Sequence, residues 1–298
     1  MASSQETPNK NCGRNSIECI VCATPLASKQ NSEKAFSELI GRPIYFYHCK
    51  TCSCLFAPEA ASLAQSLYDQ RESNNYTPNK STWMIALQRA LYGRHYGKFV
   101  HKYGIMSIVD YGCGSGVIAN ALAGRNIPIF AIDVQRERPK TLDSQVTYFS
   151  TTETPSFNDG GRTLFILRHV LEHFEHPMQQ LDTIAAFARP GDIFVVETPS
   201  AESAFKRLMK EEWPGYFPPY HVTIPTLATL HYIANGVGLV CLEARRREPP
   251  ILGGYFARNS LVAANMHRIA GLLCYPAQLA VNKLSGMSEA VEVVLEKP

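Results

Sequence analysis

Residues 107–116 read SIVDYGCGSG, an apolar run that ends in three alternating glycines. The apolar run predicts a buried strand, and the next helix is expected to begin near Val117. Gly112, Gly114 and Gly116 lack a Cβ, so the chain can turn tightly there and a ligand can lie against the backbone. A strand, a glycine-rich bend and a helix start in this order present backbone N–H groups to a nucleotide-like ligand.

Two acidic residues accompany these glycines. Asp110 ends the first strand, and Asp133 ends the apolar run 127–132, which predicts the second strand of a βαβ unit. Asp133 follows Gly112 by 21 residues, a spacing that places an acid against ribose hydroxyl groups. A dinucleotide site needs its third glycine at position 117, where Val117 would crowd a pyrophosphate. The pattern therefore argues against NAD. The alternative is that the three glycines form only a tight strand-to-helix turn without a ligand, and that Asp133 is a surface cap.

The Asp-x-Gly-x-Gly-x-Gly pattern of residues 110–116, together with Asp133, resembles the S-adenosylmethionine (SAM) site of class I methyltransferases. The resemblance implies an α/β fold with a Rossmann-like, doubly wound sheet of seven strands whose last strand is antiparallel. It also implies that SAM is the cofactor, that the three glycines pack against it, that Asp110 supports its methionine end and that Asp133 holds its ribose.

A second informative stretch, residues 163–177, reads TLFILRHVLEHFEHP. Its apolar start is typical of a central parallel strand, and by the switch-point rule the end of this strand faces the same crevice as the glycines. The stretch resembles a SAM-dependent branch that includes ubiquinone-type and natural-product methyltransferases. That resemblance implies that Arg168 and His169 border the cofactor, with Glu172 and His173 one turn along. The class I resemblance also implies that adenine lies beside the residues after the predicted third strand, such as Thr152. The alternative for Glu172 and His173 is that they cap and solvate a helix start.

Residues 211–221 form a loop that is dense in aromatic residues and prolines, after the predicted fifth strand. Its position resembles the substrate loop of zinc-ribbon-bearing C-methyltransferases of sugar nucleotides, in which a histidine takes a proton. The resemblance makes His221 the first candidate for the catalytic base, followed by His169 and His173. Those enzymes carry an acid before this histidine, whereas this chain has Tyr220. A structural histidine in a tight turn is the alternative.

Two Cys-x-x-Cys pairs, Cys19 with Cys22 and Cys49 with Cys52, are separated by 26 residues. Four thiolates in two pairs form the tetrahedral sulfur set that zinc favours, so the sequence predicts a structural zinc site in a unit that resembles a zinc ribbon. Cys54 is an alternative to Cys52 as a ligand. A metal-free interpretation, with unpaired thiols or redox pairs, also stays open.

Length and charge limit the functional classes that are compatible with this sequence. The chain has 298 residues and a net charge of +3, and 18% of its residues are charged, below the roughly 25% of ordinary globular proteins. These values argue against a strongly basic surface that binds nucleic acid. The first residues lack the pattern of a signal peptide, so we expect a cytoplasmic protein. The expected organisation is a disordered tail at 1–16, a zinc ribbon at 17–57, a helical segment at 58–104 and a methyltransferase domain at 105–298 with a helical insertion at 245–288.

The apolar run at 269–281 lies within that insertion. It is about half as long as the ~20 residues that cross a bilayer, so we expect no transmembrane segment there. Three roles stay open for it: covering the active site, joining subunits, or contacting a membrane surface peripherally. The oligomeric state is not defined by the sequence.

Together these patterns predict a SAM-dependent methyltransferase that acts on a small-molecule acceptor by in-line methyl transfer with a histidine base. A sugar nucleotide, a natural product or another hydrophobic metabolite suits the aromatic loop. Two other hypotheses are an rRNA base methyltransferase that binds RNA through its ribbon, and a SAM-binding regulatory protein without catalysis. The sequence leaves open whether carbon, oxygen or nitrogen is methylated.

Overall fold

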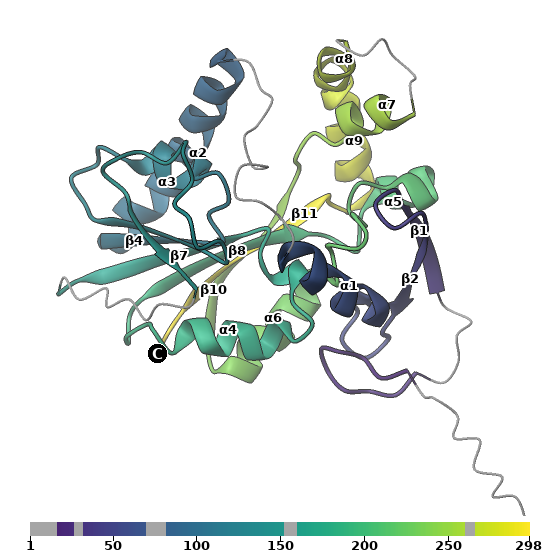
Figure 1. Ribbon diagram of the computed structural model, residues 1–298, viewed down its shortest axis with the longest axis horizontal. Coiled ribbons are helices and arrows are strands. Elements are labelled where there is room, and N and C mark those ends of the chain that lie inside the picture. Colours follow the sequence, from purple (N-terminus) through teal and green to yellow (C-terminus); the bar gives the residue numbers. More distant parts are fainter. Residues whose placement is uncertain (1–16, 27–31, 70–81, 152–159, 260–265) are drawn as a thin grey trace, which may run out of the picture.

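The computed structural model describes residues 17–26, 32–69, 82–151, 160–259 and 266–298. Its larger sheet has seven strands in the order β10-β11-β8-β7-β4-β5-β6 (Figure 1). Strand β11 pairs antiparallel with both β8 and β10, and the pairings among β4 to β8 are parallel. The predicted Rossmann-like sheet with an antiparallel last strand is therefore confirmed. The strands are β4 (Ile105–Tyr111), β5 (Ile129–Asp133), β6 (Thr147–Ser150), β7 (Arg162–Arg168), β8 (Ile193–Pro199), β10 (Val240–Arg247) and β11 (Ala290–Glu296).

Helices cover both faces of this sheet, as a doubly wound fold requires (Figure 1). Helices α2 (Thr82–Tyr103) and α3 (Val117–Leu122) pack on one face, and α4 (Pro177–Ala185) and α6 (Leu227–Val237) pack on the other. Ile108 contributes to the core on the α2 side, while its neighbour Val109 contributes to the core on the α4 side. The strands are apolar on both faces because each face is buried.

A second, antiparallel sheet has four strands in the order β1-β2-β3-β9. Three strands come from the N-terminal region: β1 (Ser32–Ser37), β2 (Arg42–His48) and β3 (Leu55–Phe56). The fourth, β9 (Thr223–Ile224), comes from the loop that follows β8, and Leu55 pairs with Ile224. The N-terminal sheet is therefore completed by a strand from the segment between β8 and α6. Helices α1 (Pro58–Asp69) and α5 (Ala204–Met209) pack beside it.

In the described residues between β10 and β11 lie the helices α7 (Leu252–Arg258), α8 (His267–Leu273) and α9 (Tyr275–Ser285). They project from the sheet on the same side as α2 (Figure 1). The described residues also form two short 3-10 helices, η3 (Leu171–His173) and η4 (Lys210–Glu212). Within the described ranges, no helix combines the length and the hydropathy that a membrane span needs.

Candidate active site

The glycine loop joins β4 to α3. Gly112, Gly114 and Gly116 all have positive φ angles, of 72°, 53° and 75°, so the backbone conformation itself favours glycine at each. A Cβ on Gly112 would lie 2.6 Å from Val170 Cγ2, and one on Gly116 would lie 2.4 Å from Leu142 Cδ1. These two glycines are therefore needed for contacts within the protein. Their predicted contact with the cofactor stays a prediction.

The two predicted acids take different positions around this loop. Asp133 lies at the end of β5, and its Oδ2 accepts a hydrogen bond of 2.8 Å from the Gly114 N–H. Asp110 is buried, and its Oδ2 accepts a hydrogen bond of 3.0 Å from Ala119 N in the first turn of α3. Burial raises the pKa of Asp110 to about 7. Asp110 thus fixes the start of α3, and the carboxylate of Asp133 lies beside the loop. Its predicted contact with a ribose stays a prediction.

Arg168 ends β7 and turns toward α2. Its Nε donates to Glu197 Oε1 over 3.0 Å, and its guanidinium lies 5.0 Å from the centre of the Tyr92 ring. The ion pair and the stacking hold the side chain between β8 and α2. Of the remaining predicted cofactor residues, His169 follows directly in the chain, whereas Thr152 lies outside the described residues.

The three candidate bases surround one buried carboxylate, Glu172. The Nδ1 atom of His169 lies 2.8 Å from Glu172 Oε1, and the Nε2 atom of His221 lies 4.0 Å from the same oxygen. The rings of His173 and His221 meet edge to face, with centres 5.0 Å apart. Glu172 Oε2 is buried without a hydrogen-bond partner in the described part of the chain. The structure thus brings together three histidines from two distant segments.

The electrostatics of this cluster follow from burial and from the charges around it. Burial lowers the pKa of His221 to about 3. Burial by itself would raise the pKa of Glu172, but the neighbouring histidines outweigh it and hold this pKa at about 2. The Nδ1–H of His221 donates to the Gly215 carbonyl over 2.8 Å, so Nε2 is left with a free lone pair. His221 is therefore a neutral imidazole that turns its basic nitrogen toward a carboxylate.

Backbone contacts explain why these segments meet. Val170, next to His169, packs against Gly112, which places the histidine cluster beside the glycine loop. Val222 N donates to the Glu172 carbonyl over 2.7 Å, and Ala57 N donates to the Val222 carbonyl over 2.8 Å. The segment after β7, the loop that carries His221 and the N-terminal sheet are thus tied together.

The sequence placed Glu172 one turn beyond the residues expected to border the cofactor, but it did not indicate that Glu172 contacts the candidate bases. The sequence carried one usable signal, because an acid three residues after His169 lies on the same face of a helical turn. Its contact with His221, 49 residues later, had no local signal.

The N-terminal cysteines converge as their spacing predicts. One Sγ atom from each of Cys19, Cys22, Cys49 and Cys52 lies within 4.8 Å of the others. The Sγ atoms of Cys19 and Cys52 are 3.6 Å apart, and those of Cys22 and Cys49 are 3.5 Å apart. Four thiolates about 2.3 Å from a zinc ion lie about 3.8 Å from one another, so the cluster fits zinc.

Cys54 belongs to the same group of thiols. Its Sγ lies 3.6 Å from that of Cys19 and 3.4 Å from that of Cys52. Five thiols therefore compete for four positions, and Cys52 and Cys54 both stay candidates.

Among the described residues, two further groups of side chains bring together atoms of the kind that bind metals, each within 4.8 Å: Glu172, His173 and His221, and His95, Glu197 and Glu292. In the second group, Glu292 contacts His95 at 2.6 Å, while Glu197 contacts Arg168. These acids are already paired with basic side chains, so the second group is a charge network that joins α2 to the sheet.

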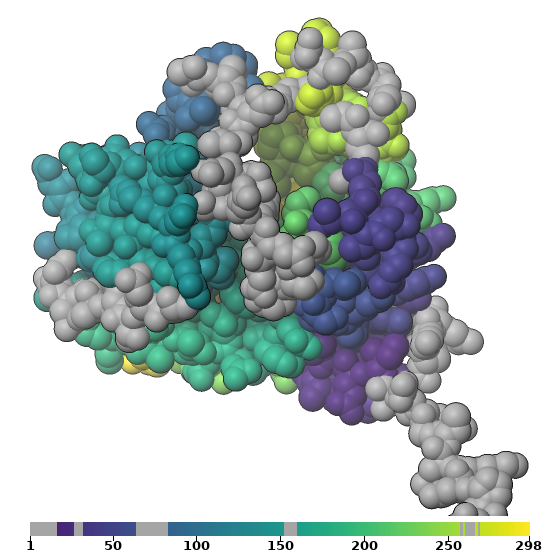
Figure 2. All heavy atoms as spheres, viewed as in Figure 1, coloured from purple at the N-terminus to yellow at the C-terminus, as the bar shows by residue number. Residues whose placement is uncertain are grey.

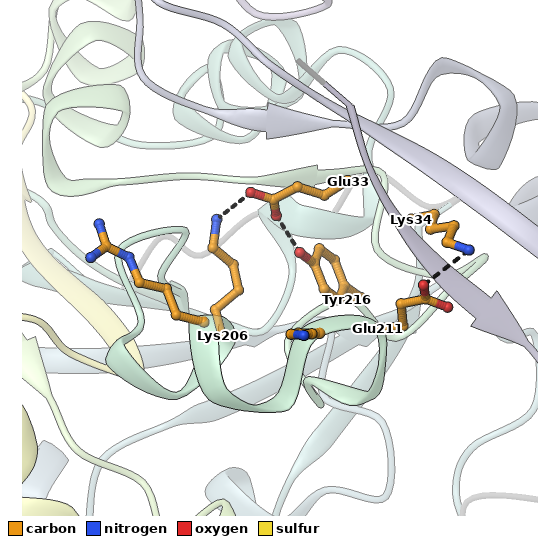
Figure 3. Close-up of a pocket in the computed structure, with 7 residues that line it drawn as sticks. Glu33, Lys34, Lys206, Glu211 and Tyr216 are labelled. Carbon is orange, nitrogen blue, oxygen red and sulfur yellow. Dashed lines mark hydrogen bonds and ion pairs between the residues drawn. The ribbon is translucent and has the colours of Figure 1, made fainter. Parts of the chain in front are cut away.

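A surface pocket lies where β1 meets α5 and η4 (Figure 3). Glu33 accepts hydrogen bonds there from Lys206, over 3.1 Å, and from Tyr216, and Lys34 pairs with Glu211 over 3.0 Å. None of the predicted site residues lines this pocket. Its contacts fasten the N-terminal sheet to the helices that follow β8.

The sheet topology, the glycine loop after the first strand of the α/β sheet and the acid after the second define a class I methyltransferase fold. Residues 80–244 match the family model described as a methyltransferase domain, and the chain belongs to this family.

The chain is also similar to two curated proteins, the ubiquinone biosynthesis O-methyltransferases of Rickettsia typhi and Rickettsia felis. It is 29% and 26% identical to them over 100 residues. Each match covers 31% of this chain and 41% of the relative, so the similarity spans less than half of those proteins.

Among solved structures, the plantazolicin methyltransferase BpumL, in complex with a desmethyl analogue and SAH, superposes with a TM-score of 0.50 at 15% identity. That match covers 80% of this chain and 96% of the other, and at this identity it supports the fold alone.

Proposed function

We propose that the protein transfers the methyl group of SAM to a small-molecule acceptor and that His221 removes the proton. The observation that carries this proposal is the group of three histidines around buried Glu172, next to the glycine loop. This position is at the carboxyl edge of the parallel strands, where ligands bind in doubly wound folds. Membership of the methyltransferase domain family supports the reaction class.

SAM supplies an electrophilic methyl group when it is bound, and the protein has to hold the acceptor in line with it at about 3 Å. Asp133 is our candidate for binding the ribose, and the glycine loop for lying beneath the adenosyl group. The unprotonated Nε2 of His221 accepts the acceptor's proton; burial disfavours the imidazolium that forms, and Glu172, 4.0 Å away, offsets part of that cost. His169 orients this carboxylate through its 2.8 Å contact.

The aromatic loop supports a flat or hydrophobic acceptor. Phe217 is exposed and stacks on Tyr220, with ring centres 5.3 Å apart, and its ring also lies 5.3 Å from that of His221. Two aromatic rings beside the proposed base favour a ring-bearing or otherwise apolar metabolite. The ubiquinone biosynthesis enzymes among the relatives are consistent with an acceptor of this kind.

Incubation with methyl-labelled SAM and fractionated cell extract tests the reaction directly. We expect the label in a small apolar or sugar-nucleotide product, with SAM converted to S-adenosylhomocysteine. Label recovered in RNA would indicate that the methyl acceptor is a nucleic acid. The absence of S-adenosylhomocysteine with every fraction would favour a SAM-binding protein without catalysis.

Replacing Asp133 with alanine is expected to weaken SAM binding about 10- to 100-fold, because a hydrogen bond to a charged group is worth about 1.5–3 kcal/mol. Isothermal titration calorimetry with SAM and with S-adenosylhomocysteine measures the change. Asp182→Ala is the matched control, since Asp182 is an exposed aspartate on α4. Equal affinity in both variants would remove Asp133 from the cofactor site.

A further inference from the structure

Helix α9 has its polar and apolar faces reversed relative to an ordinary surface helix. Gln278 and Asn282 are 0% and 2% exposed and point into the protein. Gln278 accepts a hydrogen bond from Ile251 N and donates one to the Pro249 carbonyl, and Asn282 donates to Glu248. Leu284, by contrast, is 88% exposed. A surface helix whose outer face contacts only water places its apolar residues toward the protein core. The apolar outer face of α9 therefore indicates contact with an apolar neighbour.

Helix α8 repeats this arrangement. Its small residue Gly271 faces inward, because a Cβ there would lie 2.5 Å from the Cα of Gly253 in α7. Its large residues face outward: Leu273 is 76% exposed, and Ile269 and Leu272 are exposed as well. Helix α8 therefore packs closely against α7 through Gly271, while its leucines are exposed on the opposite face.

A third apolar row lies on the N-terminal half of α2. Trp83, Leu87 and Leu91 recur every four residues and are all exposed, Trp83 by 61%. The next residue on α2, Tyr92, contacts Arg168 at the carboxyl end of β7, so this half of the helix extends past that edge of the sheet.

Helices α7 to α9 leave the sheet at the same edge. They follow β10, which runs parallel to β8 because β11 is antiparallel to both. Helices α2 and α8 reach the same end of the molecule, at the top of Figure 1. The space-filling view shows the blue atoms of α2 and the yellow-green atoms of α8 at this end (Figure 2).

The charged residues at this end of the molecule indicate what it contacts. Residues 82–103 and 249–288 contain no aspartate or glutamate, although the chain has 26 of them. The parts of these segments that form the face, residues 82–94 and 249–288, contain five lysines and arginines, against a net charge of +3 for the whole chain. All of the acidic residues therefore lie elsewhere in the sequence. Two copies of this face, joined about a two-fold axis, would bring like charges together, whereas an anionic lipid surface would be attracted to both segments.

We propose that α8, α9 and the N-terminal half of α2 form a lipid-binding face that docks on the surface of an anionic membrane. The exposed leucines of α8 and α9 and Trp83 enter the boundary between headgroups and acyl chains, and Lys283 extends toward the headgroups. This inference concerns binding alone and does not depend on the acceptor or on the catalytic base. It also places the carboxyl edge of the large sheet toward the membrane.

Vesicle flotation of the zinc-loaded, full-length protein tests the proposal. We expect binding to phosphatidylcholine vesicles that contain roughly 30% phosphatidylglycerol, weaker binding in high salt, and little binding to phosphatidylcholine alone. The double variant Leu273→Glu, Leu284→Glu should lower the partition coefficient at least about ten-fold. Leu208→Glu is the matched control, because Leu208 is 70% exposed on α5, outside this face, and should leave binding unchanged.

Tryptophan fluorescence gives a second readout that needs no core substitution. The chain has two tryptophans, and Trp213 is buried, so a blue shift on adding vesicles reports on Trp83. Trp83→Phe should abolish the shift. Loss of binding in Leu208→Glu, or no binding to anionic vesicles, would overturn the proposal. A dimer that dissociates in the Leu273→Glu, Leu284→Glu variant, without lipid binding, would assign the face to self-association instead.

Discussion

Replacing His221 with alanine is expected to lower kcat by about 10²- to 10⁴-fold while SAM affinity changes by less than about two-fold. The expected loss is large because the Nε2 of His221 is the buried, unprotonated nitrogen that faces Glu172, and its other nitrogen is fixed by the Gly215 carbonyl. Single-turnover kinetics and calorimetry with SAM separate the two effects. His231→Ala, on α6, is the control histidine because it lies outside the cluster.

Glu172→Gln tests the proposed positioning role of the carboxylate in the same assay. We expect kcat to fall with little change in KM, because the carboxylate stabilises the imidazolium only after the proton has moved. The pKa of His221, near 3, also predicts no loss of activity from its titration between pH 8 and pH 5. Wild-type turnover in the His221→Ala variant would indicate that His169 or His173, and not His221, is the catalytic base.

Loss of the metal should destabilise the whole protein and also reduce turnover. Cys19, Cys49 and Cys52 belong to the same buried core as Val109 of the large sheet. Binding free energies of structural zinc sites are large, so we expect Cys49→Ser or chelation to cost at least ~3–5 kcal/mol and to lower Tm by roughly 10 °C. Metal analysis should find about one zinc per chain before chelation. Scanning calorimetry and circular dichroism then measure the change in stability.

The effect on turnover follows from the path between the cysteines and His221. Strand β3 begins one residue after Cys54 and pairs with β9, which begins two residues after His221. A disordered cysteine cluster would therefore release one side of the loop that carries His221. Cys241→Ser, a thiol on β10 outside the cluster, is the control, and comparing Cys52→Ser with Cys54→Ser identifies the fourth ligand. Unchanged Tm and metal content below one equivalent would contradict the zinc site.

Much of the fold was predictable because its signals are local. An apolar run before three glycines predicted β4 and the start of α3, and the resemblance to class I methyltransferases predicted the doubly wound sheet. The two cysteine pairs predicted a cluster because each pair is close in sequence. The three histidine candidates were also identified individually, from the loops that follow β7 and β8.

The arrangement of those pieces was not predictable in the same way. Neighbouring residues did not indicate that Glu172 would lie between His169 and His221, because this depends on the packing of two loops 49 residues apart. The run 269–281 was expected to be apolar, but which side chains of α9 face inward is set by Glu248, Pro249 and Ile251, which bind its two buried polar residues.

The sequence by itself determined the class of fold, the glycine loop and the two cysteine pairs, because each is specified by residues within one strand, one turn or one short spacing. Only the tertiary structure decided that β9 completes the N-terminal sheet and carries His221 to Glu172. The physical reason is that Leu55 and Ile224 pair through backbone hydrogen bonds, which any two extended segments can form. Their pairing is selected by the burial of both segments in one core.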